Sequence, residues 1–156
     1  MIKMGDISDG ALEIVKTLKE NGFKCYLVGG CVRDLLMGKT PDEWDLTTDA
    51  EPKEVSKLFH KVVPTGIKYG TVTVVLDSQT FEVTTFRKDE RYVDGRHPSN
   101  VKFTKKLEED LERRDFTINA MAFDPVDSKF IDLFSGEKDL KKKIIKAVGD
   151  PKERFL

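Results

Sequence analysis

The sequence predicts an α+β domain in which a small mixed sheet is backed by helices. The chain has 156 residues, about the length of one domain. Segments with apolar residues at helical spacing are interspersed with short β-branched and aromatic runs. Their order is helix, strand, helix, strand, helix, hairpin and then helices, which does not match regular βαβ winding. We therefore expect one layer of helices on one side of a mixed sheet.

The first half of the chain predicts alternating helices and strands. Residues 8–20 are expected to form a helix, because their apolar residues recur every three or four positions and Asn21-Gly22 can end it. A proline at position 52 is well placed for a first helical turn. The elements expected after the first helix are a strand at 25–28, a helix at 32–37, a strand at 45–48 and a helix at 52–59.

The second half predicts a hairpin followed by shorter elements. Two β-branched and aromatic runs, 71–76 and 81–86, flank four polar residues and predict a β-hairpin. Residues 88–100 are polar and contain Asp-Gly and a proline, so they are expected to form a loop. The remaining expected elements are helices at 107–113 and 116–122, strands at 130–133 and 144–148, and a charged helical turn at 137–143.

Charge and cysteine content restrict the function classes. The net charge is −1, from 27 basic and 28 acidic residues, so nucleic acid binding would depend on local basic clusters. Two such clusters are Lys102 with Lys105 and Lys106, and residues 141–143, although a solvated helix face explains them equally well. Cys25 is expected to be a buried free thiol. No apolar run reaches the roughly 20 residues that span a membrane, and a cytoplasmic protein is expected.

The segment Gly29-Gly30-Cys31-Val32-Arg33-Asp34 is the first candidate for a binding site. Two glycines between a strand and a helix let the backbone approach a ligand closely, and free N–H groups at a helix start favour phosphate. Arg33 can pair with a phosphate through its planar guanidinium group, and Asp34 can hold Arg33 in place. By itself, the pattern also fits an ordinary turn with a surface ion pair.

Three carboxylates form the second candidate. Glu43 and Asp45 are two apart, so on a strand they would point to the same side while Trp44 points to the other. Hard oxygen ligands suit Mg²⁺, and a two-metal site needs a further acid, which Glu82 on a neighbouring strand can supply. Each of these acids taken alone also fits a solvated strand edge.

The last candidate is the run Arg113-Arg114-Asp115-Phe116-Thr117-Ile118-Asn119. Arg114 can bind a triphosphate, and Asp115 can accept a hydrogen bond from a ribose hydroxyl. Asn119 would lie on the same helical face as Asp115, four residues later. A charged amphipathic helix is the alternative interpretation.

Taken together, the segments LVGGCVRDLLMGKTPDEWDLTTDA, FEVTTFR and LEEDLERRDFTINAMAFDP resemble class II tRNA nucleotidyltransferases (CCA-adding enzymes) and bacterial poly(A) polymerases. The resemblance covers about residues 7–156. It implies a catalytic head domain over residues 1–156 with the nucleotidyltransferase fold of the DNA polymerase β superfamily. It also implies template-independent addition of C or A from CTP or ATP to the 3′ end of tRNA.

The resemblance also implies roles for individual residues. Glu43 and Asp45 would be the metal-binding catalytic pair, serving two Mg²⁺ ions with Mn²⁺ as an alternative, and Glu82 would be the third acid near the primer hydroxyl. The residues implied to bind the nucleotide are Gly29, Gly30, Arg33, Arg114, Asp115 and Asn119.

Two departures from the family pattern bear on function. Position 43 is Glu where the family has Asp, and Mg²⁺ tolerates little distortion. The neck motif Glu-Asp-x-x-Arg, which selects the base, is absent, as are the body and tail. We therefore expect an excised head domain with weak tRNA affinity, or a chain that needs a complementing chain or self-association. Poly(A) addition, partial CC or A addition, and a non-catalytic nucleotide-binding domain stay open as alternatives.

Overall fold

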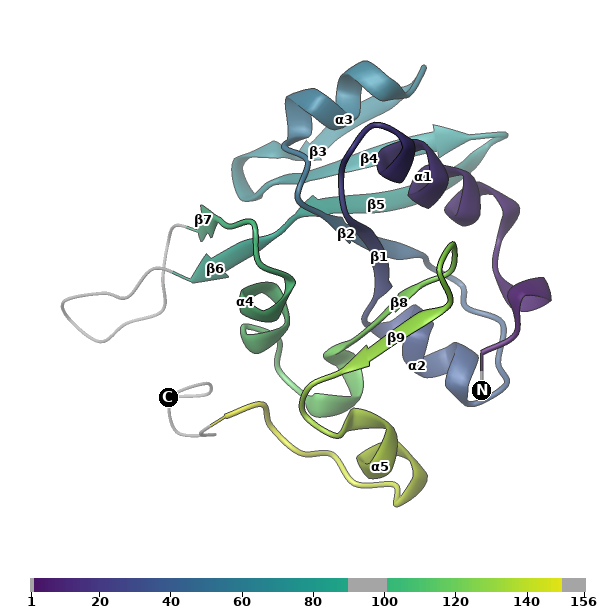
Figure 1. The fold of residues 1–156 in the computed structure, drawn as a ribbon, viewed down its shortest axis with the longest axis vertical. Helices are drawn as coiled ribbons and strands as arrows, with labels where there is room; N and C mark the ends of the chain where they lie inside the picture. Colours follow the sequence, from purple (N-terminus) through teal and green to yellow (C-terminus); the bar gives the residue numbers. More distant parts are fainter. Residues whose placement is uncertain (1, 90–100, 150–156) are drawn as a thin grey trace, which may run out of the picture.

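The computed structural model describes residues 2–89 and 101–149, and its central feature is a seven-stranded mixed sheet (Figure 1). Its strands are β1 (Cys25–Val28), β2 (Asp45–Thr48), β3 (Val62–Gly66), β4 (Thr71–Leu76), β5 (Gln79–Thr85), β8 (Met121–Asp124) and β9 (Lys129–Asp132). Their order across the sheet is β3-β4-β5-β2-β1-β8-β9. A separate two-stranded sheet pairs β6 (Arg87–Asp89) with β7 (Val101–Phe103). The predicted α+β class is confirmed.

Five α-helices and three short 3₁₀ helices are described around these sheets. The α-helices are α1 (Asp9–Glu20), α2 (Gly30–Leu36), α3 (Pro52–Leu58), α4 (Leu107–Glu112) and α5 (Gly136–Lys141). The 3₁₀ helices are η1 (Met4–Asp6), η2 (Ile67–Tyr69) and η3 (Thr117–Asn119). Figure 1 shows α1 and α3 close together beside β3, β4 and β5, with α4 and α5 toward the other end of the molecule.

Helices cover both faces of the sheet, not one as expected. The main core joins α1, α2 and α3 to inward residues of the strands, with Leu18, Leu46 and Phe81 almost fully buried. A second cluster lies on the opposite face, where Leu111 of α4 packs with Val28. Successive strand residues point to opposite faces, so β1 contributes Leu27 to the main core and Val28 to the second cluster.

The pairing of β2 with β5 is parallel, and the other strand pairs described are antiparallel. This register places Asp45 opposite Glu82 and Thr48 opposite Thr85. Paired residues on adjacent strands point to the same face. The parallel pairing therefore sets two of the predicted acids side by side, although 36 residues of chain separate them in sequence.

The strongest sequence patterns agree with the structure. The predicted helix at 8–20 corresponds to α1, in which Ala11, Ile14, Val15 and Leu18 are buried. The predicted hairpin corresponds to β4 and β5. On β5, Phe81, Val83 and Thr85 are buried while Glu82 is only partly buried. This alternation places Glu82 on the face of the sheet opposite to Phe81.

The predicted helix at 116–122 is wrong. Only Thr117–Asn119 form a 3₁₀ turn, and Met121–Asp124 form β8, which pairs with both β1 and β9. All four residues of β8 are buried, so the strand has no alternation of polar and apolar residues. A short apolar run of this kind cannot be distinguished from a buried helix by its periodicity.

The predicted strand at 144–148 is also wrong. Ala147 makes only an isolated bridge with Phe116, and Ile145 is 71% exposed. Strand β3 was not predicted, since most of its residues are exposed at the sheet edge. In the predicted loop at 88–100, residues 88 and 89 belong to β6, and the rest lie outside the described residues. No helix in the described part of the chain combines the length and apolarity needed to cross a membrane.

Candidate active site

The turn between β1 and α2 has a backbone conformation that requires glycine. Gly29 has φ 77° and ψ −137°, a region that is accessible essentially to glycine alone. A Cβ atom on Gly29 would lie 3.3 Å from Nη1 of Arg114, and one on Gly30 would lie 3.3 Å from Nη2 of Arg33. The two glycines therefore leave room for two guanidinium groups that approach the same turn.

We predict that Gly29→Ala destabilises the fold by about 1–3 kcal/mol, because alanine pays a strain energy at this φ and crowds Arg114. Urea unfolding of the two proteins measures the difference. Gly5→Ala is the matched control, since a Cβ atom there would meet nothing within 4 Å. An equal loss of stability in both variants would show that the Gly29 turn is not strained by a side chain.

Arg33 is held by hydrogen bonds on two sides. Its Nε and Nη2 donate to Oδ1 of Asp34 at 3.3 and 3.2 Å, and its Nη1 donates to Oδ1 of Asn119 at 2.9 Å. Asn119 in turn donates from Nδ2 to Oδ1 of Asp115 at 3.5 Å. The structure thus brings together Arg33, Asp115 and Asn119. Asp115 precedes the 3₁₀ turn and is not part of a helix, so the contact does not come from the shared helical face that was expected.

Arg114 is held by Asp110, a residue that sequence analysis missed. Nη2 of Arg114 donates to Oδ2 of Asp110 at 3.3 Å. Asp110 is 1% exposed, and its carboxylate also accepts hydrogen bonds from Oγ1 of Thr47 at 3.3 Å and from the backbone N–H of Arg87 at 3.2 Å. The signal in the sequence was the four-residue spacing between Asp110 and Arg114, which suits an ion pair at a helix end. Asp110 therefore fixes Arg114 to β2 and to the start of β6.

Part of the Arg114 guanidinium group has no partner. Its Nε is buried and makes no hydrogen bond within the described residues. A buried donor without an acceptor costs free energy, and a bound anion would remove this cost. This feature fits the expected binding of a phosphate group at Arg114.

Two of the predicted acids, Glu43 and Glu82, lie within electrostatic reach of the third, Asp45. Asp45 is the first residue of β2, and the N–H of Glu82 donates to the carbonyl oxygen of Trp44 at 3.2 Å. Burial raises the pKa of the Asp45 carboxyl. The positive charge of Arg114 opposes this rise, and the negative charges of Glu43 and Glu82 add to the rise in the Asp45 pKa. Arg114 thus lies beside the glycine turn and also interacts electrostatically with the carboxyl of Asp45.

The expected strand geometry of Glu43 is not observed. Glu43 lies in a bend before β2 and is exposed, so only Asp45 of the pair is on the strand. Trp44 packs against the main core, as its opposite orientation predicted. In residues 2–89 and 101–149 no three His, Cys, Asp or Glu side chains are arranged closely enough to hold a metal ion.

We predict that Asp45→Asn stabilises the metal-free protein near neutral pH. A carboxyl whose pKa is raised in the folded state binds protons there at a pH where the unfolded state has lost them. Wild-type stability therefore rises as the pH falls through the raised pKa of Asp45, whereas asparagine does not titrate. Urea unfolding in the presence of a chelator should give Asp45→Asn a larger free energy of unfolding than the wild type at neutral pH. The difference between the two should become smaller at acidic pH. A variant that is less stable at neutral pH would contradict the raised pKa of Asp45.

The two cysteines are structural. Both Cys25 and Cys31 are buried and free, which confirms the prediction for Cys25. Burial raises the pKa of the Cys31 thiol to about 11. Its Sγ donates to the carbonyl oxygens of Val28 and Asp45 at 3.4 and 3.7 Å. Cys31 therefore ties α2 to the start of β2.

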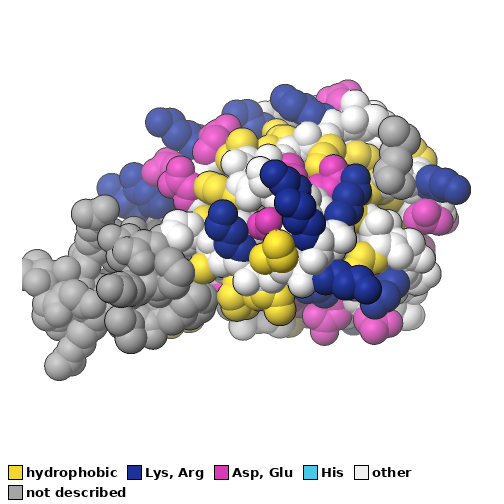
Figure 2. Space-filling view, turned by 90° about the horizontal axis from the view of Figure 1, so that it is seen from below, with side chains coloured by type: hydrophobic (Ala, Val, Ile, Leu, Met, Phe, Trp, Pro, Cys, Tyr) yellow, Lys and Arg dark blue, Asp and Glu magenta, His cyan; other side chains and the backbone are white. Residues whose placement is uncertain are grey.

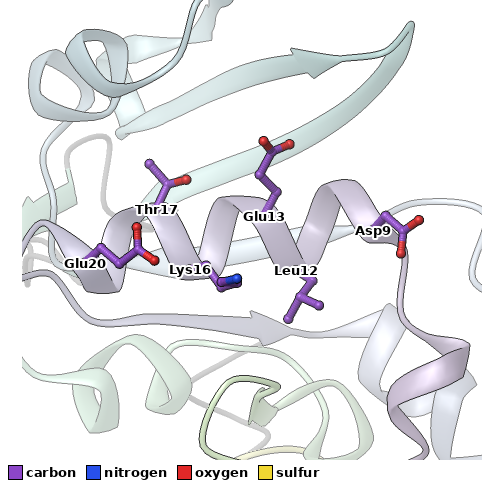
Figure 3. Close-up of a pocket in the computed structure, with 6 residues that line it drawn as sticks. All are labelled: Asp9, Leu12, Glu13, Lys16, Thr17 and Glu20. Carbon is purple, nitrogen blue, oxygen red and sulfur yellow. The ribbon is translucent and has the colours of Figure 1, made fainter.

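Other surface features do not add to this site. A hollow of about 400 Å³ is lined by Asp9, Leu12, Glu13, Lys16, Thr17 and Glu20 of α1. Figure 3 shows these side chains pointing to different sides of the helix, and none belongs to the candidate site. On the face shown in Figure 2, Lys and Arg side chains are mixed with acidic and apolar ones. The described surface therefore gives no single basic patch on that face.

Comparison with known proteins connects this arrangement to a family. The profile of the family described as "Poly A polymerase head domain" matches residues 25–146. This range includes every candidate residue from Gly29 to Asn119. The chain belongs to the Poly A polymerase head domain family. The seven-stranded sheet with helices on both faces is thus the nucleotidyltransferase fold, as the resemblance implied.

This head domain is similar to CCA-adding enzymes. It is 49% identical over 153 residues to the CCA-adding enzyme of Lactobacillus helveticus, an alignment that covers 98% of the chain and 38% of the relative. The crystal structure of the Bacillus stearothermophilus CCA-adding enzyme in complex with CTP matches with a TM-score of 0.84 and 43% identity, over 93% of this chain and 34% of that one. The Thermotoga maritima CCA-adding enzyme complexed with tRNA matches with a TM-score of 0.72 and 27% identity, over 92% and 34% of the two chains. The chain therefore spans well under half the length of these relatives.

Proposed function

We propose that residues 1–156 are the catalytic head domain of a tRNA nucleotidyltransferase, which adds C and A from CTP and ATP to tRNA 3′ ends without a template. The observation that supports this most is the position of Arg114. Its guanidinium group lies beside the Gly29 turn, and its charge acts on the carboxyl of Asp45. In a nucleoside triphosphate, the reacting α-phosphorus is next to the β- and γ-phosphates. In this site, the acids that would act at the α-phosphorus are next to the guanidinium group that would bind the phosphates.

Arg33 and Arg114 are proposed to bind the triphosphate. Planar guanidinium groups match phosphate oxygens through paired hydrogen bonds. Asp34 and Asn119 hold Arg33, and Asp110 holds Arg114. The five side chains are therefore placed before the nucleotide arrives, which reduces the entropy lost when it binds.

The acids fit a divalent cation. Asp45 is partly buried close to the charges of Glu43 and Glu82, and this repulsion favours a bound cation. Asp45 and Glu43 would hold Mg²⁺ or Mn²⁺, with two ions in the proposed mechanism. When bound, such ions polarise the phosphates and lower the pKa of the attacking hydroxyl.

The remaining candidate residues are proposed to orient the substrates. Glu82 is paired with Asp45 on the neighbouring strand and would lie next to the primer 3′-hydroxyl. Asp115 is exposed next to Asn119 and would accept a hydrogen bond from the ribose. Arg33 and Arg114 would neutralise charge that develops on the leaving phosphates, the role that preorganised donors play in phosphoryl transfer.

The relatives support the choice of substrates. The Bacillus stearothermophilus structure contains CTP, and the Thermotoga maritima structure contains tRNA. Both proteins are about three times as long as the region they share with this chain. We propose that base selection and most tRNA affinity belong to regions outside the shared part, so this domain alone binds tRNA weakly.

An incorporation assay tests the proposed function. The chain is incubated with a tRNA that lacks its 3′-terminal CCA, with Mg²⁺ or Mn²⁺ and with each labelled nucleoside triphosphate in turn. A chimera in which the chain replaces the matching region of the Lactobacillus helveticus enzyme is tested in parallel. We expect addition of C and A by the chimera and slower, less selective addition by the chain alone.

Two results would contradict the proposal. Triphosphate binding without incorporation, in the chain and in the chimera, would favour the alternative of a non-catalytic nucleotide-binding domain. Repeated addition of A alone by the chimera would favour a poly(A) polymerase.

A further inference from the structure

A chain of polar side chains crosses the sheet from the candidate site to its edge. Asp45 on β2 is paired with Glu82 on β5, and Glu82 is paired with Thr73 on β4. Oγ1 of Thr73 donates to Oε1 of Glu82 at 2.7 Å. On the far side, Oγ1 of Thr73 lies 2.8 Å from Oγ1 of Thr65 on β3. The four residues come from four adjacent strands.

The direction of these hydrogen bonds follows from the number of protons. An ionised carboxylate only accepts, so the single hydroxyl proton of Thr73 points to Glu82. Thr73 can then only accept from Thr65, and the hydroxyl of Thr65 is the donor. Thr73 is 6% exposed, so water does not readily replace its hydroxyl. Thr65, Thr73 and Glu82 therefore form a chain of hydrogen bonds, here called the relay, in which Thr65 donates to Thr73 and Thr73 donates to Glu82.

We propose that Thr73 is a positioning residue that anchors Oε1 of the Glu82 carboxylate on the β4 side of β5, with Thr65 orienting the Thr73 hydroxyl. This inference rests on the proposed catalytic role of Glu82. The relay fixes Oε1, and no hydrogen bond ends on Oε2 in residues 2–89 and 101–149. Oε2 is thus the oxygen left for a substrate. The backbone of Glu82 is separately fixed by its N–H bond to the Trp44 carbonyl.

The same sheet face provides a matched control. Oγ1 of Thr71 and Oγ1 of Thr84 are 2.9 Å apart on the same two strands, two residues further along. This pair has the same chemistry, and no carboxylate is bonded to it among the described residues. Thr71→Val and Thr73→Val remove the same group from neighbouring positions of β4, so a difference between them reports on Glu82.

The first test is kinetic. We expect Thr73→Val to lower kcat for nucleotide incorporation by about tenfold and to leave KM for the triphosphate within about twofold, as for loss of one hydrogen bond to a charged group. Thr73→Ser should restore most of the rate, and Thr65→Val should cause a smaller loss. Thr71→Val should match the wild type. Equal rates for Thr73→Val and Thr71→Val would overturn the proposal.

The second test does not depend on activity. Crystal structures of the wild type and of both valine variants show where the Glu82 carboxylate lies. We expect Oε1 of Glu82 to lie within hydrogen-bond distance of Oγ1 of Thr73 in the wild type and in Thr71→Val, and the carboxylate to leave that position in Thr73→Val. An unmoved carboxylate in Thr73→Val would refute the positioning role. Absence of incorporation by the wild-type chain and by the chimera would instead refute the proposed function, so the two failures are distinguishable.

Discussion

Asp45→Asn is expected to lower the rate of nucleotide incorporation by at least about 10³-fold, since it removes the charge of the carboxylate that we propose holds a catalytic cation. Asp45 is partly buried at the start of β2, with its pKa raised by burial and by two neighbouring acids. Asparagine has the same shape but no negative charge. The side chain of Asp45 makes no recorded hydrogen bond in the described residues, so this substitution changes charge with little effect on packing.

The control for this prediction is Asp42→Asn. Asp42 is exposed in the bend before β2, three residues from Asp45, and it is not one of the acids proposed for the site. We expect this variant to keep most of the wild-type rate. The measurement is single-turnover incorporation of labelled CTP. Loss of activity in Asp42→Asn, with Asp45→Asn close to wild type, would contradict the assignment of Asp45.

Arg114→Gln is expected to weaken binding of the nucleoside triphosphate by about 10- to 100-fold, the range for loss of a charge-assisted hydrogen bond. Glutamine keeps a donor but loses the positive charge and the planar guanidinium group. Arg114 has a buried Nε without a partner, which a phosphate would satisfy. Isothermal titration with a non-hydrolysable CTP analogue measures the change, and unchanged affinity would contradict the role of Arg114.

The ion pair between Arg114 and Asp110 provides a second test of the role of Arg114. Asp110→Asn removes the charge that holds Arg114 and keeps one acceptor oxygen, which can still accept from the N–H of Arg87. We therefore expect a smaller loss of affinity in Asp110→Asn than in Arg114→Gln. The double variant should bind no worse than Arg114→Gln alone, because coupled residues are not additive. Additive losses would show that Asp110 does not act through Arg114.

The parts of the site that could be predicted from the sequence are those encoded by local patterns. The Gly29-Gly30 turn, the Arg33–Asp34 pair and the inward–outward alternation around Glu82 each depend on neighbouring residues. The convergence of these segments rested on the family resemblance, because the parallel pairing of β2 with β5 joins residues far apart in sequence. Local patterns carry no information on such a pairing.

Asp110 and Thr73 were missed for the same reason. Asp110 looked like one of three acids on an exposed helix, but α4 packs on the sheet and buries it against Thr47. Thr73 looked like one β-branched residue among several on β4, and its contact with Glu82 depends on strand register. Strand β8 was mistaken for a helix because it is buried on both faces. In each case tertiary packing decides the role of the residue.

The measurement that tests the account most directly is a crystal structure of the chain with a non-hydrolysable CTP analogue and Mn²⁺, whose anomalous scattering locates the metal. The account predicts an anomalous peak at Asp45, with the triphosphate against Arg33 and Arg114 beside the Gly29 turn. A triphosphate bound elsewhere, or Mn²⁺ bound away from Asp45, would contradict it.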